Sequence, residues 1–255
     1  MFKERVKFVA ASIYRPFIGS GRRVVLCYHS LKADAVMNFT EQMKYLTAHC
    51  EIVKPSEILS AGPQGKPVVA VTFDDAFVSF YENAVPVLKT FNIPAGVFVP
   101  TGYIGRPCGW KMPVGHSDRE ETVADSGQLT AMEKDEIEVF SHTMTHPSLT
   151  ALSSAKLKEE LAGSKAALEQ ILGHSVGAIS YPHGRHNENV INAAQESGYR
   201  LGFTIEPQCV DELTNPYAIG RFVVSPKEPL SRFKLKACGA YAAENILRNL
   251  KRRMK

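Results

Sequence analysis

The chain has few cysteines, a single tryptophan and no long apolar run, and two of these shortages exclude whole classes of protein. Its five cysteines are odd in number and include no Cys-x-x-Cys pair, so they predict neither a disulfide framework nor a cysteine-rich zinc site. No stretch approaches the roughly 18 apolar residues of a membrane span. One Gly-x-Ser-x-Gly pattern occurs, from Gly173 to Gly177, but it follows a predicted helix and precedes a predicted strand. A nucleophile elbow needs the reverse order, strand then helix, so serine-hydrolase chemistry has no support.

Net charge is small in total but uneven along the chain. The 255 residues sum to a formal charge of +4. Residues 1–23 hold six Lys or Arg against Glu4, hence +5, and residues 231–255 hold eight against Glu244, hence +7. Subtracting both ends from the total leaves −8 for residues 24–230. An acidic body argues against binding to nucleic acid, which needs a basic face on the fold itself.

The basic ends divide the chain into three parts. These are a basic N-terminal segment over residues 1–21, a globular body over residues 22–230 and a basic C-terminal helix or tail over residues 231–255. Apolar side chains among the cations, such as Phe233 and Tyr241, predict amphipathic helices. Since anionic lipid attracts basic segments, we expect peripheral contact with a membrane. Two solvated tails are the alternative, and for the N-terminal segment an atypical signal sequence is another.

Free thiols are typical of a reducing compartment. We therefore expect a cytoplasmic protein, peripheral at the membrane if its basic ends bind lipid. An extracytoplasmic location is the alternative, because large secreted enzymes also carry free cysteines.

Short apolar runs rich in Val, Ile and Phe alternate with helical patterns along the body. The predicted strands are Val24–Tyr28, Val68–Phe73, Ala95–Val99, Glu136–Phe140, Ala178–Tyr181, Tyr199–Thr204 and Ala218–Val224. The predicted helices are Phe39–His49, Val78–Phe91, Ser153–Leu172 and Glu188–Ser197. Such alternation builds a parallel sheet covered by helices, here a closed or nearly closed barrel. Residues 101–130 predict one long irregular loop of the kind that is usually functional.

Two acidic residues, Asp74 and Asp75, follow the second predicted strand. Chemistry gathers at the carboxyl ends of the strands in a parallel barrel, and adjacent carboxylates repel each other unless a cation or a shared proton relieves them. Because neighbouring side chains diverge on an extended backbone, one can hold a metal while the other faces the reaction centre. An acidic turn that caps the next helix is the alternative.

Two histidines, His142 and His146, follow the fourth predicted strand. Side chains at i and i+4 share one face of a helical turn, a spacing that lets both imidazoles meet one ion. An unrelated solvated pair is the alternative. Together with Asp75 they would form a site of two histidines and a carboxylate with open positions. Such a site suits zinc hydrolysis or, in other folds, iron(II) oxygenation.

A Tyr-Pro-His-Gly turn, Tyr181 to Gly184, follows the fifth predicted strand. A Pro-x-Gly turn fixes the backbone and can present the N–H of His183 to a developing oxyanion; a plain turn is the alternative. Trp110, in the long loop, is a candidate to stack on a sugar ring, with a packed tryptophan as the alternative.

Three segments on successive strand ends carry a family resemblance: Thr-Phe-Asp-Asp (72–75), Ser-His-Thr-Met-Thr-His (141–146) and Tyr-Pro-His-Gly (181–184). In this order they resemble the polysaccharide deacetylase family, carbohydrate esterase family 4. The resemblance extends to Leu26–Ser30 and Ile93–Val99 and covers most of the chain.

This resemblance implies the family's distorted (β/α)₇ barrel. It also implies a divalent metal, usually zinc, held by Asp75, His142 and His146, with cobalt, nickel or iron as alternatives. Such a metal would polarise an acetamide carbonyl and lower the pKa of a bound water towards ~7. Asp74 would be the catalytic base that takes the proton of that water, and the backbone N–H of His183 would help to hold the oxyanion.

The family often has Gly after Asp-Asp, where this chain has Ala76, and two larger departures from the family pattern bear on the mechanism. The third family motif commonly carries an Arg two residues before its Pro, to orient the base, and here that position is Ser180. Arg221 is a candidate to serve instead, with a structural ion pair as the alternative. The late Leu-x-His motif that supplies the general acid has no counterpart, since no His lies beyond His186. His29 is then the first candidate for the acid and His183 the second, a packed or turn histidine being the alternative for both.

We therefore predict a metal-dependent carbohydrate deacetylase, a hydrolase that removes the acetyl group from an N-acetylated amino sugar in a polysaccharide or a lipid-linked saccharide. One alternative is a deformylase or deacetylase of a small or lipid-linked sugar, and another is a catalytically silent barrel that binds carbohydrate. The residues expected to contact the substrate or the oxyanion are Tyr181, Pro182, His183, Arg221 and Trp110.

Overall fold

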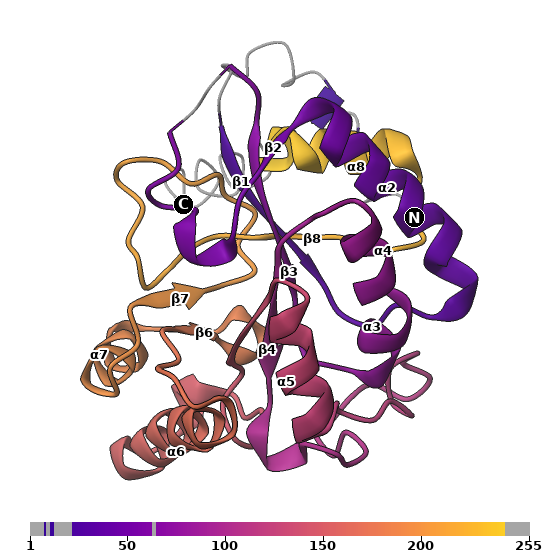
Figure 1. The fold of residues 1–255 in the computed structure, drawn as a ribbon. Helices are drawn as coiled ribbons and strands as arrows, with labels where there is room; N and C mark the ends of the chain where they lie inside the picture. The colour runs from indigo at the N-terminus through magenta and orange to yellow at the C-terminus, as the bar shows by residue number, and fades with distance from the viewer. Residues whose placement is uncertain (1–7, 9–10, 13–21, 63–64, 243–255) are drawn as a thin grey trace.

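A curled parallel sheet wrapped by helices forms the centre of the molecule (Figure 1). The computed structural model describes residues 8, 11, 12, 22–62 and 65–242. Its strands are β1 (Arg23–Tyr28), β2 (Glu51–Ile52), β3 (Val68–Phe73), β4 (Ala95–Val99), β5 (Ile137–Ser141), β6 (Ala178–Ser180), β7 (Leu201–Phe203) and β8 (Phe222–Val223). All seven predicted strands are present, and β2 is an additional short strand that pairs with β3.

The sheet closes on itself through the segment that contains β8. Its strand order is β7-β6-β5-β4-β3-β1-β8, with every pair parallel. At one end of this path Phe222 of β8 pairs with Leu26 of β1. At the other end Ile219, just before β8, pairs with Phe203 of β7. Residues 219–223 thus join both ends of the path, as the predicted distorted (β/α)₇ barrel requires.

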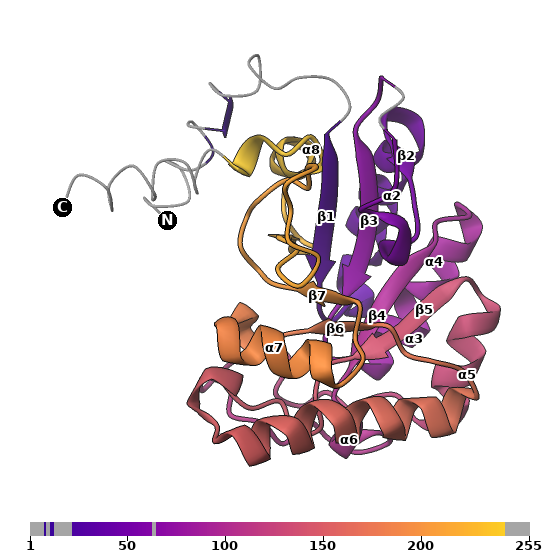
Figure 2. The same cartoon turned by 90° about the vertical axis from the view of Figure 1, so that its left-hand side faces the viewer.

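Seven α-helices of the described residues cover this sheet. They are α2 (Val36–His49), α3 (Val78–Asn83), α4 (Val85–Thr90), α5 (Ser126–Lys134), α6 (Ser154–Leu172), α7 (Glu188–Glu196) and α8 (Leu230–Ala237). Short 3₁₀ turns occupy Ala33–Ala35, Pro55–Glu57, Thr101–Tyr103, Leu149–Ala151, Pro182–Gly184 and Ala240–Ala242. Figure 2 shows α6 and α7 side by side next to β6 and β7.

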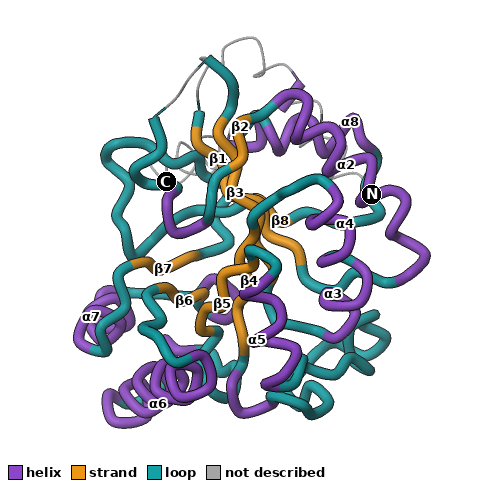
Figure 3. Tube along the Cα trace, viewed as in Figure 1, coloured by secondary structure: helices purple, strands orange, loops and turns teal. Residues whose placement is uncertain are grey.

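Two predicted elements differ from the structure. The single helix predicted over Val78–Phe91 is wrong: α3 and α4 are separate, because Pro86 has no backbone N–H to continue the ladder. The predicted loop 101–130 is too long, because Asp125 and Gln128 form a capping box that starts α5. The irregular segment is residues 104–125, here called the 104–125 loop, drawn in teal between β4 and α5 in Figure 3.

The helix predicted over Ser153–Leu172 is present as α6. Leu157, Leu161 and Leu168 line its buried face, and it ends at Gly173, whose φ of 77° suits a glycine C-cap. Ser153 occupies the N-cap position, but its side chain makes no capping hydrogen bond.

The described part of the C-terminal segment packs on the barrel. Phe233 of α8 is fully buried and meets the ring of Tyr45 in α2 edge-on, with centroids 6.1 Å apart. Ala237 and Tyr241 are also buried. The sequence predicts a basic amphipathic helix here, and in the structure the apolar side chains of α8 face the barrel, where α8 contacts α2 and β1.

Most residues of the two basic ends, 1–7, 9–10, 13–21 and 243–255, lie outside the described residues. Membrane contact through these ends therefore stays a prediction. Within the described residues, none of the helices has the length and apolarity needed to span a bilayer.

The barrel strands are buried on both faces, which explains why their sequences are continuous apolar runs. Leu26 and Val71 belong to the large core between sheet and helices, whereas Val25 and Ala70 belong to a smaller core. Because successive side chains of a strand point to opposite faces, this smaller core lies inside the barrel. Polar side chains follow it at the carboxyl ends of the strands, and there the candidate site begins.

Candidate active site

The two adjacent carboxylates lie where β3 leaves the sheet. The backbone N–H of Asp74 still donates to the carbonyl oxygen of Tyr28 in β1 (2.9 Å), whereas Asp75 has a positive φ of 73°. The strand ladder therefore ends between these two residues. Both are buried, at 3% and 5% exposure, but their side chains enter different surroundings.

Asp74 is held by hydrogen bonds from three side chains. Arg221 donates from Nη1 to Oδ1 and from Nη2 to Oδ2, both at 2.7 Å. Ser180 Oγ and Cys27 Sγ donate to the same Oδ2, at 3.2 and 3.6 Å. Burial alone would raise the pKa of Asp74, but the Arg221 guanidinium outweighs it and holds that pKa below its usual range. Asp74 is thus an ionised carboxylate in one fixed orientation.

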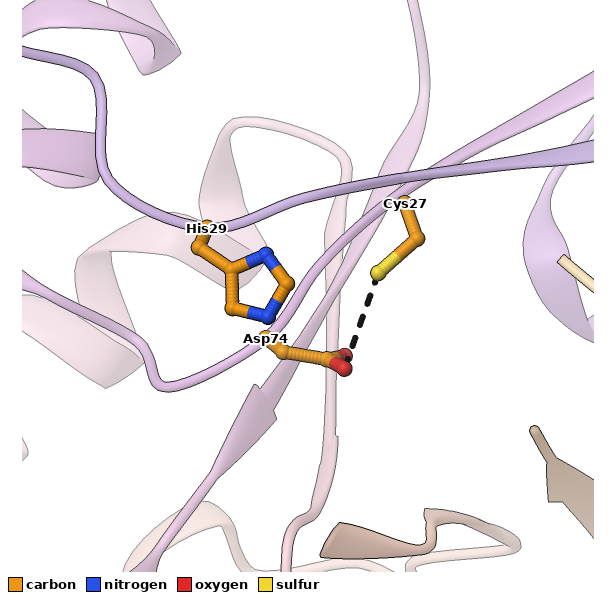
Figure 4. A group of neighbouring side chains, drawn as sticks. All are labelled: Cys27, His29 and Asp74. Atoms are coloured by element: carbon orange, nitrogen blue, oxygen red, sulfur yellow. Dashed lines mark hydrogen bonds between the residues drawn. The ribbon is translucent and has the colours of Figure 1, made fainter. Parts of the chain in front are cut away.

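Cys27, His29 and Asp74 gather at the ends of β1 and β3 (Figure 4). One nitrogen, sulfur or oxygen atom of each lies within 4.8 Å of the others, a separation that three ligands of one metal could have. Arg221 argues against a metal here, because its guanidinium already neutralises Asp74 and would repel a second cation. Burial lowers the pKa of His29, opposed by the nearby Asp74 carboxylate.

In the second group, Asp75, His142 and His146, no Lys or Arg of the described residues forms an ion pair with the carboxylate. The Nε2 atoms of both histidines lie 3.6 Å from Asp75 Oδ1, and one ligand atom from each residue lies within 4.8 Å of the others. His142 Nδ1 donates to the carbonyl oxygen of Ser180 (2.7 Å), so a neutral ring has its lone pair on Nε2. Burial lowers the pKa of His142 to about 4 and lowers that of His146 further. Both are therefore in the neutral form that binds metal.

This second group fits a divalent metal ion. Asp75 Oδ1 and His146 Nδ1 are buried, and no described residue gives either atom a hydrogen bond. Burial, and then the charge of Asp74, raise the pKa of Asp75, as expected for a second buried carboxylate without a cation of its own. Two neutral imidazoles and a carboxylate with open positions form a donor set typical of hydrolytic zinc.

Strained backbone surrounds this group. Positive φ angles occur at Asp75 (73°), Ala76 (49°), Thr143 (69°), His146 (58°) and His183 (58°). Such angles are unfavourable for non-glycine residues, and they persist where the surrounding structure enforces them, often at functional sites. The predicted helical turn between His142 and His146 is therefore wrong, although the spacing does bring both rings to Asp75.

The residues of the Tyr-Pro-His-Gly turn differ in whether their side chains reach the candidate site. The Tyr181 side chain is fully buried and its hydroxyl donates to the carbonyl oxygen of Tyr217 (3.0 Å), so it does not reach the site as predicted. Pro182 is buried in the 3₁₀ turn. The exposed ring of His183 lies edge-on to His146, with centroids 4.9 Å apart, and burial against its neighbours lowers its pKa.

Arg221 and Trp110, which were also predicted to contact the substrate, both contact other side chains of the site. Arg221 is fully buried over the rings of Phe98 and Phe203, and its two hydrogen bonds to Asp74 are those that the predicted role of orienting the base requires. Trp110 stacks on His146 with centroids 4.8 Å apart and rings 27° from parallel. Trp110 remains half-buried in this stack, and its contact with a sugar stays a prediction.

Two residues near the site were missed from the sequence. Cys27 lies in β1 and His29 directly follows that strand. Two positions along extended backbone place both side chains on one face, so the spacing could have pointed to Cys27. Asp118 lies in the 104–125 loop, where no pattern singles it out. It is 6% exposed, accepts a hydrogen bond from Ser30 Oγ (2.6 Å), and its charge opposes the lowering of the His29 pKa.

Comparison with known proteins supports these geometric findings. A family model described as polysaccharide deacetylase matches residues 61–202. The putative polysaccharide deacetylase YxkH of Bacillus subtilis is 32% identical over 227 residues, which cover 85% of this chain and 75% of that protein. Poly-beta-1,6-N-acetyl-D-glucosamine N-deacetylase of Staphylococcus aureus is 28% identical over 197 residues, which cover 73% of this chain and 66% of that protein.

Solved structures show the same fold. IcaB from Ammonifex degensii superposes with a TM-score of 0.70 at 26% identity, over 88% of this chain and 99% of that chain. The Streptococcus pyogenes deacetylase PplD superposes with a TM-score of 0.69 at 23% identity, over 89% of this chain and 97% of that chain. At that identity the second likeness concerns the fold alone.

Proposed function

Because the chain belongs to the polysaccharide deacetylase family, we propose that it is a metal-dependent hydrolase that removes the acetyl group from an N-acetylated amino sugar. The substrate class is a polysaccharide or a lipid-linked saccharide. The poly-β-1,6-N-acetyl-D-glucosamine in the name of the staphylococcal relative is the first polymer to test.

The observation that carries this proposal is the unequal environment of two adjacent buried carboxylates. Arg221 neutralises Asp74 with two 2.7 Å hydrogen bonds, while Asp75 Oδ1 faces two neutral histidines. Metal-dependent amide hydrolysis needs one carboxylate that binds the metal beside another that is ionised, does not bind the metal and can accept a proton. Asp75 and Asp74 meet these two requirements.

A divalent metal held by Asp75, His142 and His146 would supply a Lewis acid for the acetamide carbonyl and for the attacking water. Asp74 accepts the proton that the water loses, with its two oxygens oriented by Arg221. The left-handed backbone at His183 presents its N–H to the oxyanion that develops on the carbonyl oxygen.

His29 protonates the departing nitrogen. It lies at the end of β1, half-buried, with its ring beside the Asp74 carboxylate (Figure 4). The proton balance closes between these two residues. Water loses one proton to Asp74, Asp74 passes it to His29, and His29 gives it to the departing nitrogen. The products are the free amine and acetic acid, which loses its remaining proton to solvent as acetate leaves.

The test is acetate release from poly-β-1,6-N-acetyl-D-glucosamine and from β-1,4-linked N-acetylglucosamine oligomers, with added zinc or cobalt. We expect Asp74→Asn to lower the rate by about 10²–10⁴-fold, the usual contribution of a positioned base, and to leave the bound metal in place. Asp34→Asn is the matched control, because the Asp34 side chain is 67% exposed.

Two outcomes would count against this proposal. A wild-type protein that binds metal but is as inactive as Asp74→Asn on every acetylated saccharide would instead be a silent carbohydrate-binding barrel. Release of formate from formylated sugars, without acetate from acetylated ones, would identify a deformylase.

A further inference from the structure

The two histidines of the candidate metal site are held in different ways. His142 donates from Nδ1 to the carbonyl oxygen of Ser180 (2.7 Å), the usual way in which a second ring nitrogen fixes a ligand histidine. His146 has no such contact, because its Nδ1 is buried and finds no hydrogen-bond partner among the described residues. Something other than a polar anchor must orient this ring.

Aromatic rings surround His146 instead. Trp110 stacks on it at 4.8 Å between centroids, with an angle of 27°. His142 and His183 meet it edge-on, at 4.8 and 4.9 Å. Of these three neighbours, Trp110 makes the stacked contact, the arrangement that restricts rotation of the imidazole plane.

Trp110 is itself fixed by other aromatic side chains. It stacks on Phe77 at 5.9 Å and 14° and meets Tyr103 edge-on at 5.2 Å and 68°. Phe77 is fully buried beside the start of α3. The indole is thus a rigid link between the barrel and His146.

We infer that Trp110 is a positioning residue that holds His146 in its metal-binding orientation, and that metal occupancy is coupled to the 104–125 loop through this stack. The inference rests on the proposed function, since it takes Asp75, His142 and His146 as the metal ligands. By linkage, a residue that favours the bound orientation of a ligand raises metal affinity, and a bound metal in turn stabilises the contact with that residue.

The loop has further attachments, so removing the indole does not release it. Ser30 Oγ donates to Asp118 Oδ1 (2.6 Å), and Lys32 pairs with Glu121. Near α3, the backbone N–H of Val78 donates to the loop at Thr122 (2.8 Å). A substitution of Trp110 therefore tests the stack and not the presence of the loop.

The experiment is calorimetric titration of metal-free protein with zinc alone, comparing wild type, Trp110→Phe and Trp110→Leu. Residues that orient metal ligands typically contribute about 10- to 100-fold to metal affinity. We expect Trp110→Leu to weaken zinc binding by about 10-fold, because a stacked ring constrains less than a hydrogen bond, and Trp110→Phe to recover most of the loss.

The matched control is Tyr45→Leu, which removes another stacked aromatic–histidine pair. The rings of Tyr45 and His49 lie 4.4 Å apart at 15° in α2, away from the metal ligands, so zinc affinity should not change. Thermal unfolding of each variant without metal shows whether it is folded.

A second readout uses the fact that Trp110 is the only tryptophan of the chain. Its emission in the wild type should change with zinc and be quenched by cobalt, saturating at the concentration found by calorimetry. Zinc binding with unchanged emission and equal affinity in Trp110→Leu would overturn the inference and leave the proposed function standing. A wild type that binds no divalent metal would overturn both.

Discussion

Two neighbouring clusters at the carboxyl ends of the strands contain similar side chains. Each includes a buried carboxylate, and the two differ in what compensates its negative charge. The Asp74 cluster, with Cys27 and His29, receives its cation from within the protein, as Arg221. The Asp75 cluster, with His142 and His146, has no protein cation in contact with its carboxylate among the described residues.

This difference shows that proximity of ligand-type atoms does not by itself make a metal site. Both clusters bring one ligand atom from each residue within 4.8 Å. A buried carboxylate that already has a guanidinium does not need a metal, whereas one without a counter-charge has a raised pKa and would gain from one. The following experiments test this distinction.

The largest expected effect is that of Asp75→Asn. Loss of a charged ligand should empty the metal site and lower acetate release by about 10³-fold or more, because the Lewis acid supplies several kcal/mol and each 1.4 kcal/mol is about tenfold in rate. Metal content and rate are measured together. Full metal content with a normal rate would show that Asp75 is not a ligand.

The next effect in size is on folding stability. Arg221→Met should destabilise the protein by about 3–5 kcal/mol, since it leaves Asp74 as an unpaired buried charge. The measurement is urea unfolding, with Lys227→Met as control, because that lysine pairs with Asp34 at the surface, where such pairs contribute about 0–1 kcal/mol. Adding Asp74→Asn to Arg221→Met should restore part of the loss, and failure to do so would weaken the assignment of the pair.

The two aspartates should show opposite pH dependence in protein stripped of metal by a chelator. Asp74 has a lowered pKa in the folded state, so its stabilising effect is present above about pH 4, the unfolded pKa, and is lost as pH falls further. Asp75 has a raised pKa, so its unfavourable effect is absent below about pH 4 and grows as pH rises, by up to about 1.4 kcal/mol per pH unit.

It follows that at pH 7 Asp74→Asn should lower the stability of the metal-free protein, while Asp75→Asn should raise it. Both differences should shrink below about pH 4. The measurement is the free energy of unfolding of each variant across that range. Shifts of the same sign for both variants would contradict the comparison.

The smallest effects come from the weaker donors to Asp74. Ser180→Ala should cost about 1 kcal/mol, the net contribution of one hydrogen bond. Cys27→Ala should cost less from this contact, because the thiol is a weak donor at 3.6 Å. Thermal unfolding measures both, with Ser60→Ala as an exposed control. A larger effect for Cys27 than for Ser180 would mean that packing dominates at this position.

The sequence alone determined seven of the eight described strands and the metal-ligand candidates. Val68–Phe73 and Ala95–Val99 were predicted with the bounds that the structure has, because strands buried on both faces carry continuous β-branched and aromatic runs. The carboxyl ends of parallel strands meet at one edge, so Asp75 and His142 could be placed together from their positions after two such strands.

Tertiary structure decided how those residues are paired and oriented. Arg221 lies 147 residues from Asp74, and its role depends on residues 219–223 closing the barrel. The stack of Trp110 on His146 depends on how an irregular loop folds back. Local patterns report which face of a strand or helix is buried. They do not report which distant side chains share the barrel interior, and at this site those contacts decide which carboxylate is neutralised by the protein and which one is available to a metal.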